Sequence, residues 1–456
     1  MGGKMRKAGF FWSILVCVVG FATCLHASAQ SATKEAFRFG EVDLTLLEQV
    51  ELLDQRFEKE GLVYADATLQ EYLDRVGSSI LPSGELPEKV RWRFRVLRDP
   101  QANAFALPNG SIYINTGLLS LLENEDQLAS VLAHEAVHVL NRHSYLSFRS
   151  YRKKMAAINI VNYIGGSAGY SSNIGAQVVS LIGTIVPSIL AATITGYRRE
   201  LETEADLYAV DKLSATNHDT SAMVMTFQLL GREQDLNQEV VFYSDHPKLE
   251  ERMKYVKAAI QARAASSPTD STGSSERYLQ ATETVVQRDI LLAISANRPR
   301  TAFAHAQKLV KHHPDSSENM YLLAEVYRAL GPRTPEPAAE ELTKKARNDA
   351  QKLTQKFTPD EQIKELLAKP AGKAAWEENQ RKAEESYRKA LELDSSNVKA
   401  HRGLGFLFEA VQRNADAVAE YRAYLEQIPN APDQDRIQRR LDVLENRLKT
   451  TVERPQ

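Results

Sequence analysis

The five residues 134–138 constrain this chain more than any others. They read H-E-A-V-H inside an apolar stretch, residues 128–140. On a helix, positions four apart lie about 40° from each other, so the imidazoles of His134 and His138 share one face. Glu135 lies about 60° from His138 on the same surface. The spacing predicts a helix that offers two zinc ligands and a general base.

The burial of this helix is the second constraint. A short pattern recurs by chance, so a solvated helix face is the alternative interpretation. Apolar residues nevertheless surround the two histidines almost completely, which is typical of a buried helix. Buried histidines need partners, and zinc is a suitable one. Asn124 and Gln127 fit the start of such a helix.

A third ligand is predicted in a second helix, residues 198–213. Glu202 and Asp206 are four apart, so they share a face. Glu202 would bind the metal while Asp206 accepts the outer N–H of a ligating histidine. The alternative is an acidic, solvated helix start, which also suits the helix dipole.

The combined pattern resembles the HtpX and CAAX-prenyl-protease type of zinc metallopeptidase, peptidase family M48. Three further stretches resemble motifs of this family: residues 103–110 leading into 111–119, residues 197–202, and His246-Pro247 followed by Arg252. The usual Ser-Arg pair reads Tyr-Arg at residues 197–198. The resemblance covers residues 43–256, and a periplasmic member of the family with C-terminal TPR repeats has the same layout.

The resemblance implies a role for each matching residue. One zinc ion per chain would be bound by three ligands: His134, His138 and Glu202. Glu135 would activate the water and pass its proton to the leaving amine, and Asp206 would orient a ligating histidine. His246 would lie near the zinc, either stabilising the tetrahedral intermediate or occupying the open site at rest. Arg252 would support that region.

Two neighbouring segments complete the predicted site. Residues 90–96 alternate apolar and polar side chains, which predicts a half-buried strand beside a second strand, Ser111–Asn115. This second strand is expected to pair with an extended substrate through its main chain. His143 follows His138 by five residues, about 140° around a continued helix. We therefore expect His143 to be a surface or capping residue.

The N-terminus predicts export. Basic residues precede an apolar run, residues 10–25, and an A-x-A pattern ends at Ala29. This predicts a signal peptide, residues 1–29, and a periplasmic or secreted mature protein; a retained membrane anchor is the alternative. Both cysteines, Cys17 and Cys24, lie in this segment, so a cleaved product would have no thiol for catalysis. Lipidation of Cys24 is a further alternative.

The remaining segments define the predicted domains. Residues 156–196 carry no charge, which favours an apolar helical lid over a membrane span and leaves peripheral membrane contact as an alternative. Residues 43–77 have helical periodicity. Residues 383–391 recur as 417–425 at an offset of 34, the TPR period.

The chain of 456 residues is long enough for two or three domains. We predict an α+β, mostly helical fold: a gluzincin-like metallopeptidase domain with a small sheet at 30–265, a flexible linker at 266–276, and an all-α TPR-like domain at 277–456. The net charge of −2 gives no indication of a nucleic-acid partner.

Two functions fit this organisation. The first is a zinc endopeptidase that cleaves protein or peptide substrates, with repeats that dock substrates or outer-membrane and envelope assembly proteins. The second is an envelope-protein assembly factor or chaperone that rarely cleaves. The retained Glu135 favours the first, because a scaffold that only binds metal does not need it.

Overall fold

The computed structural model describes residues 39–81, 86, 89–147, 197–237, 249–263, 271–337 and 358–452. The predicted signal peptide, the uncharged segment 156–196 and His246 lie outside these residues. The chain divides into two compact units, residues 1–46 and 47–456, and every contact discussed below lies within the second. Among the described helices, none combines the length and the apolar character that a bilayer crossing requires.

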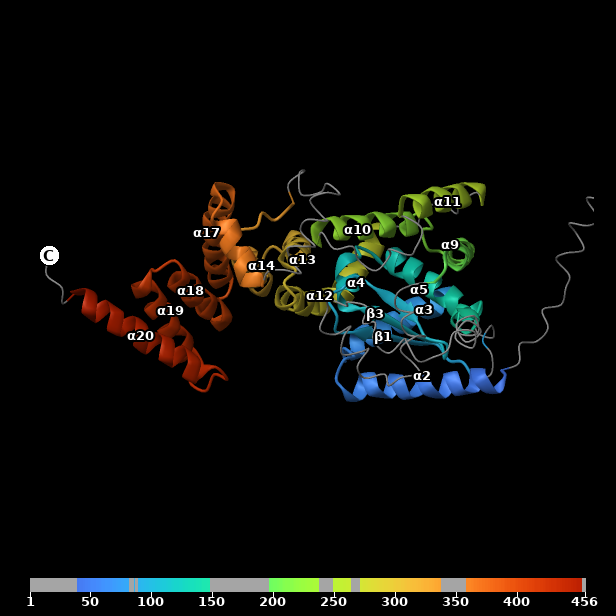
Figure 1. The fold of residues 1–456 in the computed structure, drawn as a ribbon, viewed down its shortest axis with the longest axis horizontal. Helices are drawn as coiled ribbons and strands as arrows, with labels where there is room; N and C mark the ends of the chain where they lie inside the picture. The colour runs from blue at the N-terminus through green and yellow to red at the C-terminus, as the bar shows by residue number, and fades with distance from the viewer. Residues whose placement is uncertain are drawn as a thin grey trace, which may run out of the picture. The chain divides into compact units, whose positions relative to one another are not determined.

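The described chain is mostly helical and contains one small mixed sheet, which confirms the mostly helical part of the prediction. Figure 1 shows the arrangement of these elements. In chain order they are α2 (Glu41–Lys59), α3 (Ala67–Ile80), β1 (Arg93–Leu97), β2 (Ala104–Ala106), β3 (Ser111–Asn115), α4 (Thr116–Leu121), α5 (Glu125–Leu140), α9 (Arg199–Ser214), α10 (Ala222–Asn237), α11 (Leu249–Ala262), α12 (Ser271–Ser295), α13 (Pro299–His312), α14 (Ser317–Leu330), α16 (Pro359–Leu367), α17 (Pro370–Leu393), α18 (Val398–Ala410), α19 (Asn414–Gln427) and α20 (Gln434–Val452).

The sheet has the order β1-β3-β2, with β3 parallel to β1 and antiparallel to β2. The strand Ser111–Asn115 forms as predicted, but it lies in the centre of the sheet. Its backbone is paired on both sides, so the prediction that it pairs with an extended substrate is wrong. In the described sheet, β1 and β2 are the two edge strands, and residues 62–64 hydrogen-bond to the outer side of β1.

Different helices cover the two faces of the sheet. Successive side chains of a strand point to opposite faces, so neighbouring residues show which helix packs on each. Phe94 pairs with Ile112 in the register and packs on α3, where its ring occupies the space that a Cβ at Gly77 would need. On the other face, Tyr113 packs edge-on against Phe57 of α2, with ring centroids 5.2 Å apart. Helix α5 packs against α3, β2 and β3.

The segment with helical periodicity, residues 43–77, forms two helices rather than one. The backbone of Gly61 has φ +68°, a left-handed conformation that ends α2 locally and suits glycine. Asp66 then caps α3, accepting a hydrogen bond from the Leu69 amide at 3.0 Å. Both halves of the periodic stretch therefore remain helical around a turn.

The helices from α14 onward pack as successive neighbours. Tyr387 of α17 and Tyr421 of α19 are fully buried against α18, where their rings fill the space beside Gly403 and Gly405. The two tyrosines are 34 residues apart, which agrees with the predicted repeat. The TPR-like identity of this region remains a prediction.

The predicted flexible linker, residues 266–276, is helical in its second half, because α12 begins at Ser271. The Ser274 hydroxyl is buried and donates to Asp126 Oδ2 of α5 at 3.0 Å. The Tyr278 hydroxyl donates to the Leu119 carbonyl of α4 at 2.6 Å. The serine-rich composition that suggested a flexible linker therefore includes the first turns of a packed helix.

Candidate metal centre

The helix that carries the H-E-x-x-H pattern is α5, which begins three residues before the predicted stretch. Asn124 caps it, and the Asn124 side chain accepts a hydrogen bond from the Gln127 amide at 2.9 Å. Glu125 and Asp126 place negative charge in the first turn, where the helix dipole is favourable. The helix is buried over most of its length. Its start therefore confirms the capping prediction, and its burial confirms the apolar-surround argument.

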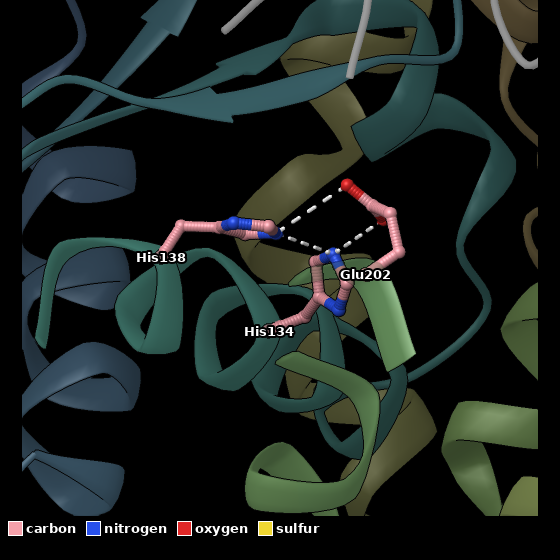
Figure 2. Close-up of side chains that lie close together, drawn as sticks. All are labelled: His134, His138 and Glu202. Atoms are coloured by element: carbon pink, nitrogen blue, oxygen red, sulfur yellow. Dashed lines mark hydrogen bonds and ion pairs between the residues drawn. The ribbon is translucent and has the colours of Figure 1, made fainter. Parts of the chain in front are cut away.

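Three side chains from two helices meet at one point. His134 and His138 extend from α5, and Glu202 reaches them from α9 (Figure 2). The two histidine Nε2 atoms lie 3.1 Å apart. Glu202 Oε2 lies 3.5 Å from His134 Nε2, and Glu202 Oε1 lies 3.7 Å from His138 Nε2. Nitrogen and oxygen donors at this separation can hold a metal ion.

The outer nitrogen of His134 faces a buried carboxylate. His134 Nδ1 lies 2.9 Å from Asp206 Oδ1, and Asp206 is fully buried. Arg252 of α11 holds this carboxylate with two bonds, from Nε at 2.9 Å and from Nη2 at 2.7 Å. The Tyr255 hydroxyl donates to the same carboxylate. The Arg252 guanidinium carbon also lies 4.5 Å from the centroid of the Phe227 ring.

The outer nitrogen of His138 faces a second histidine. His143 is buried, and its Nδ1 lies 2.9 Å from His138 Nδ1. The expectation that His143 is a surface or capping residue is therefore wrong. The reason is local: α5 ends at Leu140, and the backbone of Arg142 has φ +61°, which turns the chain back toward the helix. The angle of 140° between His138 and His143 assumed a continued helix, and the helix does not continue past that turn.

Tyr197 packs on the face of the same imidazole. Its ring stacks on His138 with centroids 4.2 Å apart and planes 17° apart. Its backbone amide donates to Glu202 Oε1 at 3.1 Å, and its hydroxyl lies 2.6 Å from Ser144 Oγ. Tyr197 replaces the serine of the family pattern, so this contact depends on a residue in which the chain departs from that pattern.

The carboxylates set the protonation of the site. Burial disfavours a charge on His134, but Asp206 and Glu202 outweigh it and raise the pKa of His134 to about 10. Burial would also raise the pKa of Asp206, yet Arg252 and His134 lower it to about 2. Burial holds the pKa of His138 well below its ordinary value. In the metal-free site the two carboxylates therefore favour the protonated form of His134, and a metal ion would compete with that proton.

Three predicted site residues remain, and two of them lie within the described residues. Glu135 is buried on α5 directly after the first histidine, and Arg252 lies next to the site as described above. His246 lies outside the described residues. Sequence reasoning placed His143 at the surface and gave no role to Tyr197 or Tyr255, because the contacts of these three residues depend on a chain reversal and on helix packing.

A buried H-E-x-x-H helix that faces a glutamate from a second helix defines a class, the metal-dependent hydrolases. Comparison with known proteins gives the family. Residues 67–260 match the model of peptidase family M48, so this part of the chain is a domain of that family. The match includes both helices of the metal centre, α5 and α9.

Named relatives agree with this assignment. The chain is 30% identical over 230 residues to a putative beta-barrel assembly-enhancing protease of Vibrio cholerae, covering 48% of this chain and 46% of the relative. It is 29% identical over 189 residues to the mitochondrial metalloendopeptidase OMA1 of Schizosaccharomyces pombe, covering 41% and 51%. It is 27% identical over 172 residues to the metalloprotease YcaL of Escherichia coli, covering 37% and 61%. The chain thus spans about half the length of the first two relatives, and the matches support a metalloendopeptidase domain.

Proposed function

We propose that this protein is a zinc-dependent endopeptidase. The observation that carries the proposal is the spacing of the three donors, His134, His138 and Glu202. Two donors bound tetrahedrally to one zinc ion at about 2.1 Å lie about 3.4 Å apart. The two Nε2 atoms lie 3.1 Å apart, Glu202 Oε2 lies 3.5 Å from His134 and Glu202 Oε1 lies 3.7 Å from His138, all close to that value. With one donor atom taken from each residue, the three donors lie within 4.8 Å of one another. Two imidazoles and one carboxylate are also the ligand set of several zinc peptidases.

The chain's own groups then have defined roles. Bound zinc would polarise the scissile carbonyl and lower the pKa of a coordinated water to about 7. Glu135 would accept the proton of the attacking water and deliver it to the leaving amine. Asp206 would fix the tautomer of His134, so that Nε2 presents its lone pair to the metal. Arg252 would keep Asp206 ionised within the buried site.

His246 completes the proposed site, with two opposite roles open. If it stabilises the tetrahedral intermediate, His246→Ala should lower proteolysis. If it occupies the open metal position at rest, the same substitution should raise basal proteolysis. The direction of the change separates the two roles.

Substrates and location form the outer part of the proposal. The A-x-A pattern ending at Ala29 supports export to the periplasm or secretion. The Vibrio cholerae relative is named as a putative beta-barrel assembly-enhancing protease, and on that basis we propose misfolded or unassembled envelope proteins as substrates. The helices of the C-terminal region would form the docking surface for substrates or assembly partners, and residues 156–196 would cover the site or contact a membrane.

An assembly factor or chaperone with little turnover is the second candidate. It is supported by the same relative and by the extended helical region. It differs from the first candidate in one measurable respect, which is whether the intact metal centre cleaves unfolded protein.

The test uses the full chain and an unfolded substrate such as casein. Glu135→Gln should keep stoichiometric zinc and reduce cleavage by about 100-fold or more, because the general base is lost. Glu200→Gln is the matched control: it removes a carboxylate from the exposed side of α9 and should cleave at the wild-type rate. His134→Ala should lose zinc. Cleavage by Glu135→Gln at the wild-type rate would refute the mechanism, and a zinc-loaded wild type without cleavage would favour the chaperone.

Capture by the same inactive variant addresses the substrate. Glu135→Gln should retain proteins that the wild type releases as fragments, and these proteins can be identified by mass spectrometry. A trapped protein that the wild type does not cleave would not be a substrate.

A further inference from the structure

We propose that His143 is a positioning residue that orients His138 for metal binding. The inference rests on the proposed function, because it assigns a second partner to one of the proposed ligands. His143 lies beyond the end of α5 and reaches His138 only because the chain reverses at Arg142.

The imidazole of His138 is fixed by two groups that meet it in different ways. His143 approaches in the ring plane through the Nδ1–Nδ1 contact of 2.9 Å, and the two rings are inclined at 76°. Tyr197 covers the face of the same ring at 4.2 Å. Stacking limits tilt, and the in-plane contact limits rotation about χ2. Together they leave Nε2 directed at His134 and Glu202, where the metal would lie.

The proton pattern follows from the chemistry of imidazole. To bind metal through Nε2, His138 must be neutral and carry its proton on Nδ1. That N–H can only be accommodated if His143 Nδ1 accepts it, so His143 must carry its own proton on Nε2. His143 Nε2 lies 3.7 Å from Glu204 Oε2, and the Asn141 amide donates to Glu204 Oε1 at 2.7 Å. Glu204 therefore faces the nitrogen that has to be protonated.

The two ligating histidines thus have different outer partners. His134 faces the ionised Asp206, whereas His138 faces an uncharged ring that is fully buried. A second carboxylate in this position would add a buried negative charge without a second arginine to balance it. A neutral acceptor orients the ligand without that cost.

The test compares variants of His143 in the full-length Glu135→Gln protein, which we expect not to digest itself. His143→Leu keeps much of the volume but has no acceptor. His143→Asn keeps an acceptor, because its Oδ1 can occupy the position of Nδ1. His143→Gln places its amide further out, where it misses His138. The readouts are zinc affinity by competition with a chromophoric chelator and the thermal midpoint of the metal-free protein.

We expect His143→Leu and His143→Gln to weaken zinc binding by about 10- to 100-fold, the usual loss for an outer partner. His143→Asn should stay within a few-fold of the parent. The matched control is His218→Leu. It removes a histidine that contacts Asp126 at 2.8 Å, and Asp126 lies about 18 Å along α5 from His138. This control should lower the thermal midpoint without changing zinc affinity.

Two results would overturn the inference. One is zinc affinity in His143→Leu or His143→Gln equal to that of the parent. The other is an equal loss in the Asn and Gln variants, which would mean that His143 acts through packing alone. If His143→Leu fails to fold, the comparison of Asn with Gln still decides. If the parent Glu135→Gln protein binds no zinc, the proposed function itself is refuted. That result differs from the two above, in which the parent binds zinc and the His143 variants decide.

Discussion

The ion pair between Arg252 and Asp206 carries the most quantitative prediction. The side chains are 4% and 0% exposed and are joined by two hydrogen bonds of 2.7 and 2.9 Å. Arg252→Met keeps an apolar side chain beside Phe227 but removes both bonds. Because Asp206 would remain buried without its main partner, we expect metal-free protein to lose about 3–5 kcal/mol of unfolding free energy.

A double-mutant cycle isolates the pair from the rest of the site. Asp206→Asn removes the charge and keeps an acceptor for the neighbouring hydroxyl of Tyr255. The double variant Asp206→Asn with Arg252→Met should lose less than the sum of the single losses, by about 1–3 kcal/mol. Arg252→Lys is the conservative control, because it keeps the charge but lacks the two-pronged geometry.

The assay is urea unfolding of chelated protein followed by tryptophan fluorescence. The chain has three tryptophans. Replacing Trp12 and Trp376 with phenylalanine leaves Trp92, which directly precedes β1 and reports on the peptidase domain. A loss below about 1 kcal/mol for Arg252→Met, or strict additivity in the cycle, would refute the view that Asp206 is an ionised, buried partner of Arg252.

Three further outcomes are expected. Burial raises the pKa of Asp99 to about 6. The protonated form therefore stabilises the fold below pH 4, and this stabilisation is lost as the pH rises through 6. Asp99→Asn, which keeps the acceptor for the Gln101 amide, should match the wild type near pH 4 and exceed its unfolding free energy by up to about 3 kcal/mol at pH 8; an equal difference at both pH values would contradict this. Gly403→Ala places a Cβ 2.3 Å from the Tyr387 ring and should cost about 1–3 kcal/mol in urea unfolding followed by Trp376 fluorescence, whereas an unchanged midpoint would mean that the ring can move. Chelation of the metal should lower the thermal midpoint of the peptidase domain, because the ion would bind only the folded state; identical melting curves with and without chelator would count against a bound metal.

The elements with strong local signals were predictable from the sequence. The capped, apolar helix around residues 134–138 has a period, a start signal and a burial signal that agree, and the structure places it within three residues of its expected start. The strand Ser111–Asn115 has the predicted bounds for the same reason. Local patterns of this kind depend on neighbouring residues, which a sequence displays directly.

Features that depend on distant contacts were not predictable. The alternation of a strand does not say whether it lies at an edge or in the centre, so the substrate-pairing role given to β3 was wrong. His143 was assigned by extending a helix that in fact ends before it, and a positive φ at Arg142 left no signal in the sequence. The serines of residues 271–275 suit a flexible linker and a helix start equally well, and only packing on α5 separates the two.

The packing of α12 and α13 on the peptidase domain has a practical consequence for dissecting this protein. Tyr278 closes over the last turn of α4, and Lys308 donates to the carbonyls of Ser120 and Leu122 at the end of that helix. In a fragment that stops at residue 265, these carbonyls would lose their hydrogen-bond donors, and the first turn of α5 would lose the contact between Ser274 and Asp126. The smallest fragment expected to fold as a peptidase domain therefore extends through His312. It includes part of residues 277–456, which were predicted from the sequence to form a separate TPR-like domain.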